Sequence, residues 1–400
     1  MRIICVIFCL ALWSLTAMAQ SPAAEYPEDY IPLLKNKNVG LVGNHTSLVD
    51  NKHLLFLVGN PPPFEHRSKH LLDVLIENNI KVVKIYAPEH GFRGTAAEGE
   101  KIDHSLDSKT GTPIISLYGN NKKPTADQLK GVDYMVFDMQ DVGTRFYTYL
   151  STMHYIMEAC AENNIPLIVL DRPNPNGFYV DGPILEPEHK SFVGMHPIPI
   201  VHGMTLGELA QMINGEGWLK NGVKCDLKVV KCRDYTHSSH YRLPVKPSPN
   251  LPNMTAIYLY PSLCLFEGTA LSVGRGTDFP FQVFGHPNFE GKQGYEFTFD
   301  PKQTTGTIKP LLNGQSCYGK DLRSMPVLHD ELYLGWLIDA YENFEPKDKF
   351  FTSYFATLSG TKKLRQQIES GKTAAEIKES WSEGLQSFKL LRKKYLLYNE

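Results

Sequence analysis

Apolar positions in the first half of the chain follow two periods that alternate. Short apolar runs rich in β-branched residues occupy 39–42, 82–86, 134–137 and 166–170. Between these runs, apolar residues recur at helical spacing over 68–77, 126–129 and 147–163. Strands that alternate with helices imply a parallel sheet covered on both faces. We therefore predict an α/β fold whose main domain is a Rossmann-like, doubly wound, mostly parallel sheet.

Two of the predicted helices carry capping residues at their ends. Asn78 and Asn79 follow the helix over 68–77, and asparagine favours a C-cap. Thr205 and Glu208 have the spacing of a reciprocal N-terminal cap, which predicts a further helix from this point. No GxGxxG motif follows the first strand, so the sequence does not indicate dinucleotide binding.

The second half of the chain begins with a proline-rich segment. Four prolines lie between 235 and 253, which is typical of a crossing between domains. Strand-like pieces follow at 256–260 and 295–299, and helical patterns at 330–341, 361–370 and 374–395. We predict a Rossmann-like domain over 20–240 and a smaller α+β domain over 241–400.

The first nineteen residues have the pattern of an export signal. Arg2 precedes an apolar stretch over 3–15, and small residues at 17–19 suit cleavage. No later stretch reaches the roughly 18 apolar residues of a membrane span. We expect residues 1–19 to be a signal peptide and the protein to be periplasmic or secreted, without stable membrane insertion.

Composition narrows the classes of ligand. Lys and Arg number 41 against 43 Asp and Glu, and no basic tract stands out, so nucleic acid is not an expected partner. Five of the seven cysteines lie beyond residue 19 without any CxxC motif. They suit buried thiols, or at most one pair such as Cys225 with Cys232, and not a zinc site. No feature of the sequence indicates an oligomeric state.

Polar clusters follow directly on four of the apolar runs, at 44–46, 89–93, 140–141 and 171–172. If these runs are parallel strands, the four clusters gather at one edge of one sheet. Open α/β sheets bind ligands outside the carboxyl ends of their strands. The candidate active site is therefore this edge.

Glu89 is the sharpest candidate within these clusters. Pro88 ends the preceding strand, and Gly91 and Gly94 permit a tight reversal that leaves Glu89 at the strand tip. Burial beside an aromatic residue such as Phe92 would raise the pKa of this carboxyl group, which suits a general acid. The alternative is that Glu89 pairs with Arg93 or caps a helix.

The other clusters combine structural and functional possibilities. Asp138 suits a buried anion, whereas Gln140 and Asp141 lie nearer the strand end and suit a site. Arg145 suits a substrate carboxylate or a protein one equally. The stiff loop over 171–177 would present polar groups to a sugar, but it is also an ordinary turn.

Further candidates lie outside these clusters. His202 directly precedes the helix that starts near Thr205, where a capping role is also open. In the second domain, Asn250, Glu267 and Arg275 would close the site from the opposite side. The chain has no HExxH metal motif and no GxSxG nucleophile elbow, which disfavours metallohydrolases and serine hydrolases.

Several of these segments, taken in order, resemble one known family. They are PEHGFRG, FDMQDVGTRFYTY, LDRPNPNG, HGMTLGELA, PSPNLP and EGTALSVGRGT. The chain resembles the exo-β-N-acetylmuramidases of the NamZ type, glycoside hydrolase family 171, formerly a domain of unknown function. The resemblance implies an enzyme of cell-wall recycling. It would release N-acetylmuramic acid from the non-reducing ends of peptidoglycan fragments, such as muropeptides or disaccharides, at a cleft between its two domains.

Under this resemblance Glu89 becomes the general acid. The candidate catalytic residues are Glu89, Asp141 and His90. The candidate substrate-binding residues are Asn44, Arg93, Gln140, Arg145, Tyr147, Asp171, Arg172, Asn174, His202, Asn250, Glu267 and Arg275. An arginine near the cleft would match the lactyl carboxylate of the substrate.

Glycoside hydrolysis usually needs a second carboxyl group. Asp141, Asp171, Glu98 and Glu267 are candidates, and the substrate's own acetamido oxygen is a further one, so the stereochemical course stays open. Two other functions also stay open. One is a non-catalytic periplasmic protein that binds muropeptides or sugars, and the other is an amide or ester hydrolase that acts on peptidoglycan.

We expect activity without a metal or any other cofactor, because no metal-ligand spacing occurs in the sequence. Treatment of the purified protein with EDTA should leave hydrolysis of a chromogenic N-acetylmuramide unchanged. Inhibition that added zinc or magnesium reverses would contradict this expectation.

Overall fold

The structure is a computed structural model that describes residues 20–50, 63–88, 92, 105–325 and 330–400. The predicted signal peptide, 1–19, lies outside the described residues. So do Glu89, His90, Arg93 and Glu98.

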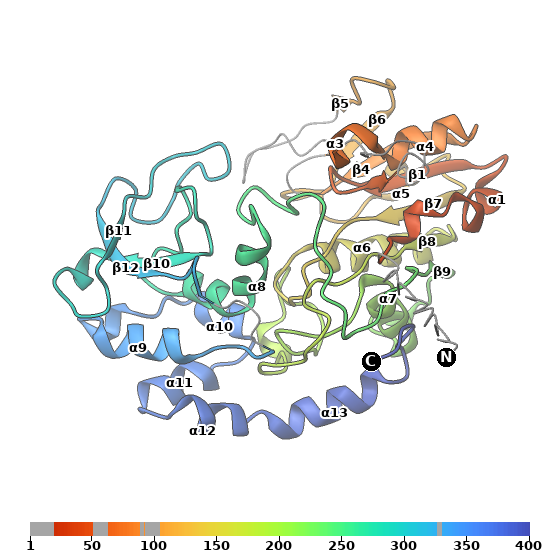
Figure 1. Cartoon of the computed structure of the whole chain (residues 1–400). Helices are drawn as coiled ribbons and strands as arrows, with labels where there is room; N and C mark the ends of the chain where they lie inside the picture. The colour runs from red at the N-terminus through yellow and green to blue at the C-terminus, as the bar shows by residue number, and fades with distance from the viewer. Residues whose placement is uncertain (1–19, 51–62, 89–91, 93–104, 326–329) are drawn as a thin grey trace, which may run out of the picture.

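The main sheet has seven strands among the described residues, in the spatial order β5-β6-β4-β1-β7-β8-β9 (Figure 1). Their bounds are β1 Asn38–Gly43, β4 Lys81–Ala87, β5 Ser105–Leu106, β6 Pro113–Ser116, β7 Tyr134–Asp138, β8 Leu167–Leu170 and β9 Leu227–Val230. β5 pairs antiparallel with β6, and the other pairings are parallel. The predicted doubly wound, mostly parallel sheet is confirmed.

The strand order reverses at β1. The chain adds β4 and β6 on one side of β1 and then β7, β8 and β9 on the other. In open α/β sheets this reversal opens a crevice at the carboxyl ends of the two strands that flank it. Here those strands are β1 and β7.

The middle of the sheet is buried on both faces because strands β1, β7 and β8 are apolar at most positions. Val136 on β7 packs into one core cluster, whereas its neighbours Met135 and Phe137 pack into the other. Helices α1 (Ile31–Leu34) and α4 (Leu71–Glu77) supply the first cluster, and α6 (Tyr149–Glu162) and α7 (Leu206–Gly215) supply the second. The period-2 alternation of strand side chains thus divides the core into two layers.

The smaller domain contains a three-stranded antiparallel sheet in the order β10-β12-β11. Its elements are α8 Met254–Leu263, β10 Val283–His286, β11 Phe297–Phe299, β12 Cys317–Asp321, α9 Gly335–Asn343, α10 Phe355–Ser359, α11 Lys363–Glu369, α12 Ala374–Glu379 and α13 Ser382–Arg392. The remaining helices and strands are β2 Leu48–Asp50, α3 Phe64–Arg67, β3 Ser68–His70 and α5 Ala126–Leu129. The short 3-10 helices are η1 Ala23–Glu25, η2 Pro27–Asp29, η3 Pro187–His189, η4 Lys220–Gly222, η5 Cys264–Gly268, η6 Pro287–Phe289 and η7 Lys347–Lys349. The α+β character predicted for this domain is confirmed.

The strand predicted over 256–260 is wrong, because this segment belongs to helix α8. The side chain of Asn253 accepts a hydrogen bond from the Ala256 N–H and begins the helix. Most residues of α8 are buried, so the segment has no polar face that would reveal a helical period. Its aromatic and β-branched residues then imitate a strand.

The single helix predicted over 374–395 is also wrong. Thr373 and Glu376 form a capping box that begins α12, and this helix ends at Glu379. Helix α13 then begins at Ser382. By contrast, the capping box predicted at Thr205 is present at the start of α7.

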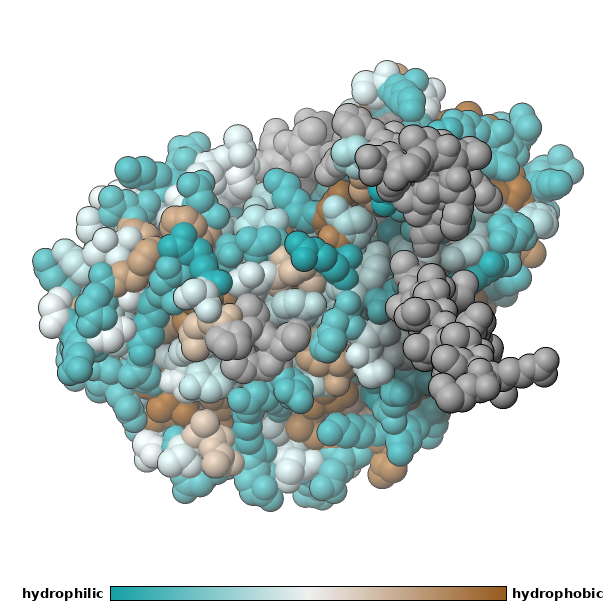
Figure 2. Space-filling view, in the orientation of Figure 1, coloured by the Kyte–Doolittle hydropathy of each residue, from teal (hydrophilic) through white to brown (hydrophobic). Residues whose placement is uncertain are grey.

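The state of the cysteines and the hydropathy of the surface agree with the expectations from composition. The five cysteines among the described residues are buried and free, so Cys225 and Cys232 are thiols and not a pair. In the described part of the chain, no helix combines the length and the hydropathy needed to cross a membrane. Figure 2 shows a mainly hydrophilic face on which the hydrophobic areas are small.

Arg145 joins the two domains from within. Its side chain is fully buried, and its two terminal nitrogens donate to the carbonyls of Pro183, Ile198, Leu358 and Ser359 at 2.7–3.1 Å. The first two carbonyls belong to the Rossmann-like domain, and the others belong to α10.

Gly360 makes this contact possible. It follows α10 with φ +76°, and a Cβ there would lie 2.5 Å from the Arg145 guanidinium. A side chain at this position would clash with Arg145 and would also strain the backbone.

We predict that Arg145→Met lowers the free energy of unfolding by at least about 3 kcal/mol, because four buried carbonyls lose their hydrogen-bond donor. Urea unfolding measures this change. The matched control is Arg365→Met on the surface, where the i,i+4 pair with Glu369 is worth under about 0.5 kcal/mol. Equal losses in the two variants would contradict a bridging role for Arg145.

Candidate active site

A cavity of about 480 Å³ lies between the two domains. Aromatic residues of both domains line it: Tyr118, Phe146, Tyr147, Tyr149, Phe192, Tyr260, Phe281 and Tyr354. Asn250, Glu267 and Arg275 line it from the smaller domain, as predicted for the opposite wall. Flat apolar rings combined with a few polar groups suit a ligand such as a sugar.

The carboxyl ends of β1 and β7 support one side of this cavity. Asn44, directly after β1, donates from its amide to the Tyr149 hydroxyl at 2.7 Å. The Asn44 carbonyl oxygen accepts from the hydroxyl and N–H of Thr46, and the Thr46 hydroxyl accepts from the Gln140 N–H at 3.0 Å. Asn44 is fully buried, so it positions Tyr149 without lining the cavity itself.

The proline-rich crossing is anchored to the same side. The Tyr147 hydroxyl donates to the Pro247 carbonyl at 2.9 Å, and a ring nitrogen of His45 lies 2.9 Å from the Lys246 carbonyl oxygen. Asn250, three residues after Pro247, then lines the cavity. These bonds bring the start of the smaller domain against the end of β1.

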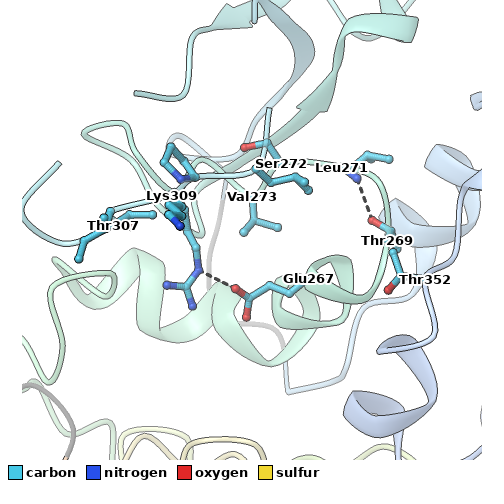
Figure 3. Close-up of a pocket in the computed structure, with 12 residues that line it drawn as sticks. Glu267, Thr269, Leu271, Ser272, Val273, Thr307, Lys309 and Thr352 are labelled. Atoms are coloured by element: carbon cyan, nitrogen blue, oxygen red, sulfur yellow. Dashed lines mark hydrogen bonds and ion pairs between the residues drawn. The ribbon is translucent and has the colours of Figure 1, made fainter. Parts of the chain in front are cut away.

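Glu267 and Arg275 form an ion pair at the opposite wall. Arg275 Nε lies 2.6 Å from Glu267 Oε1, and about a quarter of each side chain is exposed (22% and 23%). The pair also lines a second cavity of about 590 Å³ inside the smaller domain, together with Val273 and Lys309 (Figure 3). The two cavities share these two residues, so the ion pair stands between them.

Glu89, His90 and Arg93 follow β4 but lie outside the described residues. The end of β4, which precedes this segment, lies near the cavity. Leu117 donates to the carbonyl of Ala87 at the end of β4, and its neighbour Tyr118 lines the cavity. On the other side of Glu89, Phe92 is buried against the His70 ring at 4.5 Å between centroids.

Asp138 and Arg172 form a buried ion pair at the carboxyl edge. Arg172 donates to both Asp138 oxygens, at 2.5 and 2.9 Å, and to the Leu48 carbonyl. The prediction that Asp138 is a structural anion is confirmed. Arg172, predicted to bind substrate, is instead committed to Asp138, and it does not line the cavity.

Asp171 is likewise surrounded by protein donors. Its carboxylate accepts from the hydroxyls of Thr205 and Tyr398, both at 2.6 Å, and from the Gly207 N–H at 2.8 Å. These bonds hold the start of α7 and the C-terminal segment. Asp171 is fully buried, which raises the pKa of its carboxyl group to about 6.

Asn174 shares this structural character. Its amide donates to the Met204 carbonyl, and its oxygen accepts from the Asn176 N–H. Gly143, at φ +81°, leaves room for this side chain, because a Cβ there would lie 2.2 Å from Asn174 Oδ1. Neither Asp171 nor Asn174 lines the cavity.

Asp141 and His202 form a second buried group behind the cavity wall. Asp141 Oδ2 accepts from the Gly143 N–H at 2.7 Å and lies 3.8 Å from His202 Nε2. His202 Nδ1 accepts from the Met204 N–H, and burial lowers the pKa of its ring to about 3, so the ring is neutral. Burial raises the pKa of Asp141 to about 7.

Gln140 lies beside this group. Its amide donates to the carbonyls of Asp141 and Pro173, which fixes the loop after β7. Gln140 Oε1 and Asp141 Oδ1 have no hydrogen-bond partner within the described part of the chain. Neither side chain lines the cavity, so any role in substrate binding would be indirect.

Among the described residues, one group has the proximity needed to hold a metal ion: Glu186, Glu188 and His189. Glu186 already pairs with Lys363 at 2.8 Å. None of these residues lines the cavity, and none was a predicted site residue.

Among the strands that were not predicted, β6 leads directly to the cavity. β6, Pro113–Ser116, brings Tyr118 and Lys122 to the cavity. The apolar run over 114–117 followed by a polar loop has the pattern used for the other strands, so the same reasoning would have found them. Phe192 and Tyr354 also line the cavity, but neither follows a strand of the main sheet, so they carried no comparable signal.

Comparison with known proteins covers nearly the whole chain. Residues 39–255 match the model of the N-terminal part of exo-beta-N-acetylmuramidase NamZ, and residues 258–398 match that of the C-terminal part. Peptidoglycan beta-N-acetylmuramidase NamZ of Bacillus subtilis (strain 168) is 40% identical over 391 residues, covering 92% of this chain and 89% of that protein.

Two solved structures share the fold. Both are crystal structures of DUF1343 family proteins from Bacteroides fragilis NCTC 9343. One has a TM-score of 0.84 at 49% identity, and the other has a TM-score of 0.78 at 28% identity. Each comparison covers 95% of this chain and 99% of the solved chain.

We predict that Asp141→Asn changes how stability depends on pH. Because the folded state raises the pKa of Asp141 from 3.8 to about 7, it binds a proton more tightly than the unfolded state does. Asp141 therefore destabilises the wild type progressively as pH rises from about 4 to 7, by roughly 2–4 kcal/mol in total. Asparagine preserves the acceptor for the Gly143 N–H and removes this titration.

Urea unfolding at intervals from pH 4 to 8 measures the effect. The stability of the wild type relative to Asp141→Asn should fall across this range. The exposed Asp226→Asn variant should instead run parallel to the wild type. Parallel curves for Asp141→Asn would show that burial does not perturb this carboxyl group.

Proposed function

The chain belongs to the exo-β-N-acetylmuramidase NamZ family and is a glycoside hydrolase, and we propose that it releases N-acetylmuramic acid from the non-reducing ends of peptidoglycan fragments. The observation that carries this proposal is where the two family segments meet. Residues 39–255 and 258–398 both contribute walls to the cavity of about 480 Å³. A substrate held in this cavity would contact both segments.

The cavity suits a terminal sugar residue. Its volume falls within the range of roughly 300–1,000 Å³ that is usual for small-molecule sites. Aromatic rings supply apolar faces, and Tyr147, Asn250 and Arg275 supply polar groups at the wall. A site of this size can hold one terminal sugar residue, which agrees with the removal of end residues that we propose.

Glu89 acts as the general acid in this proposal. It follows β4, whose last residue, Ala87, is bonded to Leu117 beside cavity residue Tyr118. A carboxylic acid that donates a proton to the glycosidic oxygen is the usual first requirement of glycoside hydrolysis. His90 and Arg93 belong to the same segment and would act close to Glu89.

Glu267 supplies the second carboxyl group. It is the one carboxylate among the described residues that line the cavity, and Arg275 fixes its position. Asp171 is held by four donors from the protein, and Asp141 does not line the cavity. These contacts favour Glu267 over both aspartates as the group that acts on the sugar.

The cellular setting follows from the substrate. Peptidoglycan lies outside the cytoplasmic membrane, and the pattern of residues 1–19 is that of a signal peptide. The protein would then act in the periplasm or after secretion, on muropeptides or disaccharides released during cell-wall turnover and recycling.

We predict that Glu89→Gln lowers turnover of a chromogenic N-acetylmuramide at least about 100-fold, as expected for loss of a general acid. The amide keeps the size of the side chain but cannot donate the required proton. Release of the chromophore by wild type and variant measures the effect, and product mass confirms that free N-acetylmuramic acid appears.

The matched control is Glu379→Gln on the exposed surface of α12, which should keep full turnover. Full activity of Glu89→Gln would place the acid elsewhere. If the wild type binds the sugar without turnover, or releases only peptide or lactyl products, the proposed function is wrong.

A further inference from the structure

The charged residues that line the main cavity do not balance one another. Among the described residues these are Lys122, Glu267 and Arg275. Glu267 and Arg275 neutralise each other at 2.6 Å. Lys122 has no acidic partner in the part of the chain that the structure describes, so this set of side chains carries one net positive charge.

Lys122 contacts an aromatic ring in place of a carboxylate. Its ammonium lies 4.2 Å from the centre of the Phe192 ring, which also lines the cavity. Phe192 in turn stacks on Tyr155 of α6 at 6.2 Å, with 13° between the ring planes. The lysine therefore rests against a ring that is itself held in place.

The neighbouring residues keep Lys122 directed to the cavity. Asn121 donates from its amide to the Ser116 carbonyl at 2.6 Å and fixes the loop after β6. Lys123 pairs with Glu158 and Glu162 on α6. The two adjacent lysines of this loop thus have different partners. Lys123 pairs with carboxylates of α6, whereas the ammonium group of Lys122 is available to a ligand in the cavity.

Lys122 is half-buried and lines the cavity, so a carboxylate that enters the cavity could reach its ammonium group. A cation–π contact stabilises an ammonium group by roughly 0.5–1 kcal/mol at an exposed site. A carboxylate at hydrogen-bond distance stabilises it more. A ligand carboxylate in the cavity would complete the pair, whereas a neutral sugar would not. Arg275 is a poorer partner, because the incoming anion would meet Glu267 at the same place.

We propose that Lys122 determines specificity by binding the lactyl carboxylate of N-acetylmuramic acid, and that it thereby selects this acidic sugar over neutral N-acetylhexosamines. This inference rests on the proposed function and adds the residue that binds the charged group of the substrate. It assigns the choice of sugar to the loop after β6, on the wall opposite the Glu267–Arg275 pair.

The test compares two chromogenic N-acetylmuramides, one with a free lactyl carboxylate and one with its methyl ester. The wild type should favour the free acid in kcat/KM by at least about tenfold. Lys122→Met should lose roughly 10- to 100-fold on the free acid and little on the ester, mainly through KM. Lys122→Arg keeps the charge and should restore part of the preference for the acid.

Lys130→Met is the matched control, since it removes one exposed positive charge away from the cavity. It should leave the preference unchanged. Equal losses on both substrates in Lys122→Met would indicate a merely structural role and would overturn the inference. A wild type that hydrolyses acid and ester equally well would also overturn it.

A binding measurement tests this inference independently of the proposed function. Calorimetry with free N-acetylmuramic acid and its methyl ester reports the charge preference even in the absence of turnover. If the wild type binds the acid more tightly and Lys122→Met abolishes the difference, the inference holds whether or not hydrolysis occurs. Equal affinity for the two sugars in the wild type would exclude it.

Discussion

A charged or amide side chain that leaves water needs partners within the protein, and this constraint organises the carboxyl edge of the main sheet. Arg172 is the partner of Asp138, and two hydroxyls and two N–H groups are the partners of Asp171. These polar residues hold the loops in place and leave little capacity for a ligand. The cavity is formed by the aromatic and polar groups that the loops then carry.

Two kinds of polar residue therefore follow the strands. One kind, represented by Asn44 and Asp171, is buried and determines where neighbouring segments lie. The other kind, represented by Tyr147 and Asn250, lines the cavity. Catalytic geometry in this enzyme depends on both, although a substrate contacts the second kind.

The location of the site could be predicted from the sequence more completely than its members. Strand and helix periods identify a doubly wound sheet, and parallel strands must bring their polar ends to one edge. A polar side chain is available to a ligand only if the protein does not already supply its hydrogen-bond partners. Those partners are distant in the sequence, so no local pattern predicts them. Arg145 is occupied by Leu358 and Ser359, and Asp171 by Tyr398, each more than two hundred residues away. Helix α8 was not predicted for a related reason. Most of its residues are buried, so it has no polar face that would show a helical period.

The C-terminal segment returns to the first domain along α13 (Figure 1). Arg392 binds the Gly203 carbonyl, the Leu397 N–H binds Glu208, and the Tyr398 hydroxyl binds Asp171 beside β8. The first domain is therefore completed by residues that follow most of the second domain in the chain. Folding of this chain cannot proceed strictly domain by domain from the N-terminus, and the two halves reach their final packing together.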